Sequence, residues 1–123
     1  MKRDMDLVRR MVLTIADAPG IDADIDELDG VEEDTFMQHA IWLEEAGLIN
    51  AEISQSIDGL SVIINSLTWA GCDFADAIRD ETIWNKAKSK VLKPGASWTF
   101  DILKDLVKSE ITQGFPTLRQ FSS

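Results

Sequence analysis

Apolar residues near the middle of the chain follow a helical pattern. Phe36, Ala40 and Leu43 stand at positions i, i+4 and i+7, so they share one face of a helix. Gly47 follows the last of them, and glycine readily adopts the positive φ with which many helices end. The pattern therefore predicts a central helix that ends at Gly47.

A different pattern follows this helix. Two segments, 51–57 and 60–67, are rich in β-branched residues and favour strands. Asp58-Gly59 between them is a strong signal for a two-residue hairpin turn. Thr68 can act as the N-cap of a further helix. This part of the chain is expected to form a β-hairpin and then a helix.

The flanking regions repeat these two patterns. Apolar spacing and the breaks at Pro19-Gly20 and Pro94-Gly95 define the expected elements. These are a first helix over 4–17, a short strand over 25–28 that pairs with the hairpin, a central helix starting at Glu32 or Asp34, a third helix over 68–80, a fourth over 83–92 and a last helix over about 97–112.

The order of these elements predicts an α+β fold that is mainly α. A helix ending in Gly-Leu-Ile, a hairpin, and Leu-Thr-x-x-Gly opening a new helix are typical of a winged-helix-like domain with a β-hairpin wing, here with extra C-terminal helices. We expect one domain over 1–123, with a core over about 4–92 and a loose tail over 113–123. The predicted core residues are Val8, Val12, Ile15, Phe36, Ala40, Leu43, Leu48, Ile63, Leu67, Phe74 and Ile78.

The layout of charge changes the functional picture. The formal net charge is −10, and no Lys or Arg occurs between Arg10 and Arg79. That interval contains the whole predicted helix and hairpin. Duplex DNA binding draws much of its affinity from Lys and Arg on phosphates, so the helix and wing are poorly suited to DNA. The interval 17–33 is also short for the first helix of a helix-turn-helix.

Enzyme and cofactor chemistry has little support in the sequence. The chain has one histidine, His39, and one cysteine, Cys72, which together cannot supply a zinc site. Phosphate-loop and dinucleotide motifs are absent. Asp22, Asp24, Asp26 and Asp29 alternate as in a calcium loop, but the glycine and closing glutamate do not fit. We expect no catalytic, cofactor or metal residues, a hydrogen-bonded His39 and an inert Cys72 buried beside the core.

Two further features bear on location and packing. A single cysteine suits a reducing cytoplasm, and no apolar run is long enough to predict a membrane span. The tryptophans of the later helices, Trp69, Trp84 and Trp98, are expected to pack these helices on the core, although one of them could anchor an interface.

Several phrases together resemble one protein family. They are the first nine residues, the 39–49 phrase, Leu67-Thr68-Trp69-Ala70-Gly71 and the 77–88 phrase. The family is an uncharacterised one from bacteria and their phages, domain of unknown function 2513. The resemblance extends to about residue 106. It implies a winged-helix-like fold and a phage or prophage context, and it implies no activity and no functional residues.

Charge and resemblance lead to two functional hypotheses. The first is a non-enzymatic accessory or regulatory protein that binds a basic protein surface, as an inhibitor that mimics nucleic-acid charge would do. Its candidate residues are Glu32, Glu33, Asp34, Glu44, Glu45 and Asp58. The alternative is a DNA-binding transcriptional regulator that uses Arg79, Lys86, Lys88 and Lys90. The apolar face of the last helix is also expected to allow a homodimer.

Overall fold

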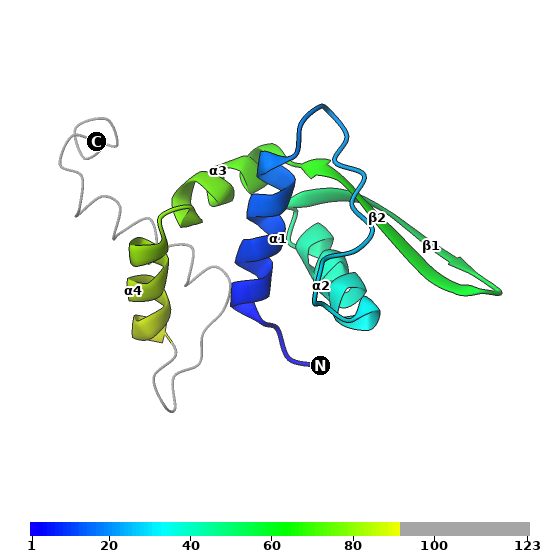
Figure 1. The fold of residues 1–123 in the computed structure, drawn as a ribbon, viewed down its shortest axis with the longest axis horizontal. Helices are drawn as coiled ribbons and strands as arrows, with labels where there is room; N and C mark the ends of the chain where they lie inside the picture. The colour runs from blue at the N-terminus through cyan, green and yellow to red at the C-terminus, as the bar shows by residue number, and fades with distance from the viewer. Residues whose placement is uncertain (92–123) are drawn as a thin grey trace. The chain divides into compact units, whose positions relative to one another are not determined.

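The computed structural model describes residues 1–91, and it shows an α+β fold that is mostly helical (Figure 1). The elements are α1 (Met5–Asp17), α2 (Glu33–Glu45), β1 (Ile49–Ser56), β2 (Gly59–Leu67), α3 (Trp69–Ile78) and α4 (Glu81–Val91). This order is consistent with a winged-helix-like arrangement. The predicted last helix over 97–112, the homodimer contact assigned to it and the tail over 113–123 lie outside the described residues.

The chain divides into two compact units, Met1–Ala75 and Asp76–Ser123. The first unit contains α1, α2, the hairpin and most of α3. In the second, α4 begins just after a break at Asp80, whose carboxylate accepts a hydrogen bond from the Ile83 backbone N–H at 2.9 Å. The break between the predicted third and fourth helices is therefore confirmed.

The start of α1 is fixed by Asp4. Its side chain accepts hydrogen bonds from the backbone N–H groups of Asp6 and Leu7, which have no partner within the helix. The helix then buries one apolar face, made by Met5, Leu7, Val8, Met11, Val12 and Ile15. The predicted first helix is confirmed, and its apolar face is wider than expected.

His39 connects the start of α1 to α2. It is 1% exposed, and its Nε2 accepts a hydrogen bond from the Asp4 backbone N–H at 2.9 Å. Because Nε2 is an acceptor, the ring proton belongs on Nδ1, which lies 2.8 Å from the Thr35 carbonyl oxygen and donates to it. The His39 ring also packs against Trp42 in an edge-to-face arrangement, with ring centroids 5.1 Å apart. The predicted hydrogen-bonded role of His39 is confirmed.

The end of α2 is a two-bond cap around Gly47, which has a φ of 77°. The Gly47 N–H donates to the Glu44 carbonyl, and the Leu48 N–H donates to the Leu43 carbonyl. These are the two bonds of a Schellman motif, and the buried side chains of Leu43 and Leu48 complete it. Gly47 thus ends the helix as its position in the sequence predicts.

The hairpin pairs β1 with β2 in antiparallel fashion, with Ile53 opposite Val62 and Ser56 opposite Gly59. The turn residues are therefore Ile57 and Asp58, and the predicted turn at Asp58-Gly59 is wrong by one position. In the described residues the positive φ near this turn falls on Gly59, at 119°, immediately after the turn. The glycine is required by backbone geometry but occupies the first position of β2.

The predicted strand over 25–28 is reduced to a single bridge. Ile25 and Ile64 exchange two backbone hydrogen bonds of 3.0 and 2.8 Å, and the Ala23 N–H donates to the Asn65 carbonyl. Pairing with the hairpin is therefore confirmed, but a regular strand as far as Leu28 is not formed. The segment before α2 runs beside the inner end of β2 as an irregular chain (Figure 1).

The start of α3 is held against the end of α2 by Thr68. Its hydroxyl donates to the Gly47 carbonyl at 2.6 Å and accepts from the Gly71 N–H at 3.0 Å, while its backbone N–H donates to the Leu48 carbonyl. The predicted N-cap is confirmed. The same residue also satisfies carbonyl groups at the end of the preceding helix.

Most predicted core residues are buried, and two are not. Ile63 and Leu67 are only half-buried, whereas Val62 and Ile64 are 4% and 1% exposed. Ile63 stands opposite Glu52, and Val62 opposite Ile53, so Ile63 lies on the other face of the hairpin from Val62. An unbroken β-branched run does not show by itself which face is inward.

Candidate protein-binding surface

The amino end of α2 carries three exposed carboxylates, Glu32, Glu33 and Asp34. Glu32 is the N-cap residue, but its side chain makes no capping hydrogen bond. Acidic groups are favourable here because the helix dipole places partial positive charge at this end. The three side chains therefore stabilise the helix start while remaining accessible to a partner.

Glu44 and Glu45, at the carboxyl end of α2, were both predicted to bind a partner, but their environments differ. Glu45 is exposed, whereas Glu44 is half-buried and its Oε2 accepts a hydrogen bond from the Ala51 backbone N–H at 3.1 Å. The β1–β2 register shifts between Asn50 and Ala51, and a shift of this kind disrupts the ladder locally. Glu44 thus has a structural role that the sequence did not reveal.

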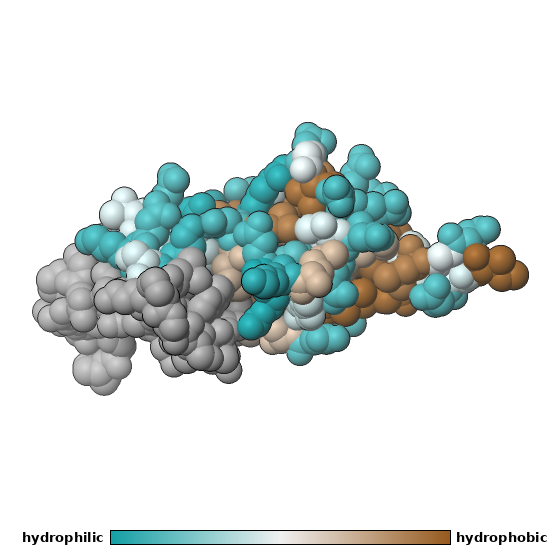
Figure 2. Space-filling model, turned by 90° about the horizontal axis from the view of Figure 1, so that it is seen from below, coloured by the Kyte–Doolittle hydropathy of each residue, from teal (hydrophilic) through white to brown (hydrophobic). Residues whose placement is uncertain are grey.

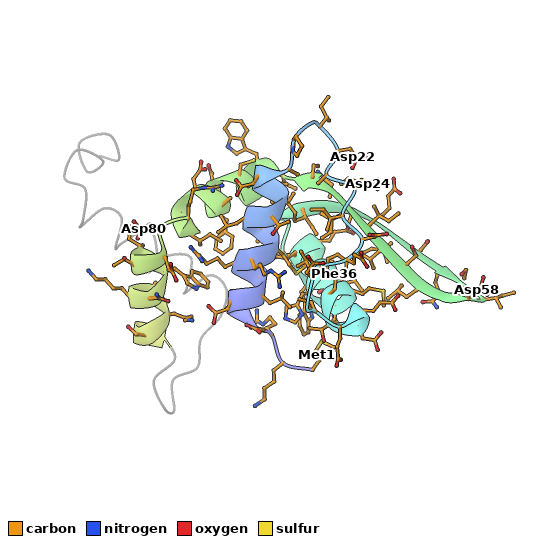
Figure 3. The ribbon with its side chains drawn as sticks, viewed as in Figure 1. Met1, Asp22, Asp24, Phe36, Asp58 and Asp80 are labelled. Carbon is orange, nitrogen blue, oxygen red and sulfur yellow. The ribbon has the colours of Figure 1, made fainter. Side chains whose placement is uncertain are left out.

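The hairpin extends beyond α2, and Asp58 lies at its tip, pointing away from the helices (Figure 3). Ile57 beside it is fully exposed, and Ile53 on β1 is 39% exposed. Figure 2 shows apolar surface continuing along the hairpin toward this tip. The wing therefore presents apolar side chains together with carboxylates.

We define the acidic surface by the exposed carboxylates of α2 and the hairpin. Its residues are Glu32, Glu33, Asp34, Glu45, Glu52 and Asp58. All six belong to the first unit, and the sequence between Arg10 and Arg79 contains no Lys or Arg. From the N-terminal segment, Arg3 borders the same hollow as Glu45, and Arg10 borders the same hollow as Glu32. The prediction that these charges are solvated is confirmed, as expected from the high cost of burying unpaired charge.

The residues of the alternative DNA hypothesis belong to the second unit. Arg79 and Lys86 are exposed and Lys88 is half-buried, whereas the side chain of Lys90 lies outside the described part. Arg79 follows the last residue of α3, and the three lysines lie on α4.

Two exposed apolar residues on the first unit were missed by sequence reasoning. Trp69 is 86% exposed and Ile21 is 97% exposed, so the expectation that Trp69 packs on the core is wrong. Cys72 is exposed too, which corrects its predicted burial. Cys72 and Ile21 border the same small hollow, together with Leu67.

The pattern of α3 explains this error. Gly71, Phe74, Ala75 and Ile78 are buried and follow i, i+3, i+4, i+7 spacing. Trp69 stands outside that set on the exposed side. Counting the glycine as an inward position would have identified the exposed tryptophan. Trp84 is 1% exposed, and Trp98 lies outside the described residues.

The described residues contain neither a metal-binding cluster nor a membrane-spanning helix. No group of three or more His, Cys, Asp or Glu side chains in residues 1–91 is placed to hold a metal ion. None of the helices α1 to α4 has the length and apolar character needed to cross a membrane.

Comparison with known proteins identifies the family. A family model described as "Hypothetical protein (DUF2513)" matches residues 2–97. The chain belongs to the DUF2513 family. This DUF2513 protein is also 30% identical over 115 residues to a protein of Haemophilus influenzae named "Uncharacterized protein", a match that covers 92% of this chain and 98% of the relative. No solved structure matches it.

Proposed function

We propose that this DUF2513 protein is a non-enzymatic module that binds a basic protein through the acidic surface. The observation that carries the proposal is the exposure of Glu32, Glu33 and Asp34 at the start of α2 together with Asp58 at the wing tip. No Lys or Arg occurs in the intervening sequence. Such a field attracts a positively charged partner, chiefly by speeding the encounter.

The proposed regulatory form is inhibition by charge mimicry. A protein that binds nucleic acid presents Lys and Arg to phosphates, and a rigid array of carboxylates can occupy the same groups. The phage or prophage context implied by the family resemblance suits an accessory protein that blocks such a host factor. Inhibition requires only that the acidic surface and the nucleic acid compete for one basic site.

The helix and wing are less suited to binding DNA than to binding a basic protein. Residues 18–32 contain no helix, so α1 is separated from α2 by a longer segment than the short turn of a helix-turn-helix. The carboxylates at the amino end of α2 would face phosphate and repel it. At ~0.15 M salt the field is screened over about 8 Å, but these charges would lie in direct contact with the duplex.

The proposal is tested by reversing charge at the acidic surface. A partner recovered from the native host and then purified should bind the full chain more weakly as salt rises. The triple substitution Glu32→Lys, Glu33→Lys and Asp34→Lys should weaken this binding by tenfold or more. A matched control reverses the exposed Asp73, Asp76 and Glu81 and changes net charge equally. Isothermal titration calorimetry measures both affinities.

Two results would contradict the proposal. Equal weakening by the triple substitution and by its control would mean that net charge, not the acidic surface, determines binding. Tight binding of the unmodified protein to a defined DNA duplex, lost on changing Lys86 and Lys88, would establish the DNA-binding alternative. Fluorescence anisotropy with labelled duplex DNA at ~0.15 M salt measures the affinity for DNA.

A further inference from the structure

Among residues 1–91, nothing pairs with the outer edge of β1 along most of its length. In the described residues β1 pairs with β2 alone, and the single additional bridge of the sheet is made by β2 through Ile64. Residues 52–56 are all exposed. An unpaired strand edge presents a row of backbone N–H and C=O groups that can pair with another chain.

In the part of the chain that the structure describes, the edge lacks the usual protection against such pairing. Proteins commonly block an exposed edge with proline, lysine, a short strand or a covering segment. Strand β1 has eight residues, none of which is Pro or Lys. On this edge the Ala51 N–H already has a partner, because it donates a hydrogen bond to the Glu44 carboxylate. The backbone of β1 beyond Ala51, where the hairpin extends past α2, therefore has no such protection.

Helix α2 supplies a flank for a strand added to this edge. The hydrogen bond that the Ala51 N–H donates to the Glu44 carboxylate places one side of α2 beside the inner end of β1. Met37 and Ile41 share that side, seven and three residues before Glu44, and both are half-buried. The partly covered apolar side chains and the open edge thus adjoin each other.

The two faces of β1 specify the chemistry of an added strand. Ile53 pairs with Val62 and lies on the apolar face, whereas Glu52 pairs with Ile63 on the opposite face. Side chains of an added strand alternate between the same two faces. Apolar residues at alternate positions would meet Ile53, and basic residues between them would meet Glu52.

We propose that β1 binds an extended segment of the partner protein as a third strand, with apolar and basic residues in alternation. This inference rests on the proposed function and adds the mode of recognition. Backbone hydrogen bonds would supply affinity, and the two side-chain faces would supply specificity. The acidic surface would guide the basic segment to the edge.

Charge argues against a second copy of the chain as the occupant. Pairing β1 with its own copy would bring two Glu52 side chains to one short sheet, without a Lys or Arg in either hairpin. Each chain also carries a net charge of −10. Like charges across a strand pair are destabilising, so a basic partner strand is favoured over self-association.

The test uses the full chain and an eight-residue synthetic peptide of alternating valine and arginine as the probe. Two further peptides carry N-methyl groups, one on every valine amide and the other on every arginine amide. Amides of alternate residues point to opposite edges of a strand. Strand addition should therefore make one modified peptide bind about tenfold more weakly or worse, and leave the other near the unmodified affinity.

Amide exchange provides a second readout that simple charge attraction would not change. On binding of the unmodified peptide, amides within residues 52–56 should gain protection, measured by hydrogen exchange with NMR detection. The same peptide with valine replaced by glycine keeps the charge and serves as the control. It should give weaker protection, because it lacks both the apolar contacts and the strand propensity.

The outcomes separate the two proposals. Equal binding of both N-methylated peptides, without protection of β1, would overturn strand addition and leave the acidic surface as the binding site. No binding of the unmodified peptide at low salt would also overturn strand addition. Protection of β1 with full affinity in the Glu32→Lys, Glu33→Lys, Asp34→Lys variant would support strand addition and contradict the proposed role of these three carboxylates.

Discussion

Gly71 lies directly against the backbone carbonyl of Leu48, so close that a β-carbon on residue 71 would overlap the Leu48 oxygen. The Leu67 β-carbon would be 3.2 Å from the same added atom. This contact joins the end of α2 to the first turn of α3, where Thr68 already forms four hydrogen bonds. The junction therefore needs a residue without a side chain.

Replacing Gly71 with Ala should destabilise the protein by about 1–3 kcal/mol, the usual cost of overpacking. Intrinsic helix propensity alone predicts the opposite sign, because Ala is favoured over Gly in a helix by about 1 kcal/mol. Urea denaturation followed by circular dichroism measures the change. Cys72→Ala, on the exposed side of α3, is the control and should change stability little. A more stable Gly71→Ala protein would exclude the close contact.

Gly47→Ala should cost about 1 kcal/mol for a different reason. An added methyl group would meet no atom within 4 Å, so the loss comes only from placing a β-carbon on a residue with a φ of 77°. Gly47→Asn is a suitable comparison because Asn tolerates this conformation better than Ala. Equal stability of the Ala variant and the native protein would show that the α2 cap is not required.

Thr68→Val should destabilise the protein by about 1–3 kcal/mol, because it removes the bond to the Gly47 carbonyl and leaves the Gly71 N–H unpaired. Thr68→Ser keeps the hydroxyl and should recover most of this loss. Both variants are compared by the same urea denaturation. If Ser and Val behave alike, the hydroxyl makes no net contribution and only the methyl group matters.

Trp69→Ala should change the free energy of unfolding by no more than about 0.5 kcal/mol, because the indole is 86% exposed. Phe74→Ala, one turn further along α3 at a fully buried position, should cost about 3–5 kcal/mol. Thermal and urea denaturation measure both changes. A large loss at Trp69 would mean that its indole is covered in the native protein.

Leu43→Ala should cost about 2–5 kcal/mol, the range for a truncated buried leucine. Leu43 is 3% exposed and belongs to the cap of α2, so the loss includes packing against Leu48. Its comparison is Ile57→Ala at the exposed hairpin turn, which should change stability little. Urea denaturation that shows less than about 1 kcal/mol for Leu43→Ala would contradict the predicted helical face.

Local signals in the sequence determined the elements of this fold. Spacing of Phe36, Ala40 and Leu43 defined the inner face of α2, and Gly47 marked its end, because helix periodicity and capping depend on neighbouring residues alone. The absence of Lys and Arg between Arg10 and Arg79 likewise predicted the solvated carboxylates, since unpaired charges cannot be buried in such number.

Tertiary structure decided the features that depend on distant partners. The sequence did not show that Glu44 would bond Ala51, or that Gly71 would face Leu48, because both contacts arise only once α2, the hairpin and α3 are packed. The run Val62-Ile63-Ile64 is β-branched throughout, so only pairing with β1 determined which residues face the core. The open edge of β1 was also hidden in the sequence, because an edge is defined by the strands that surround it.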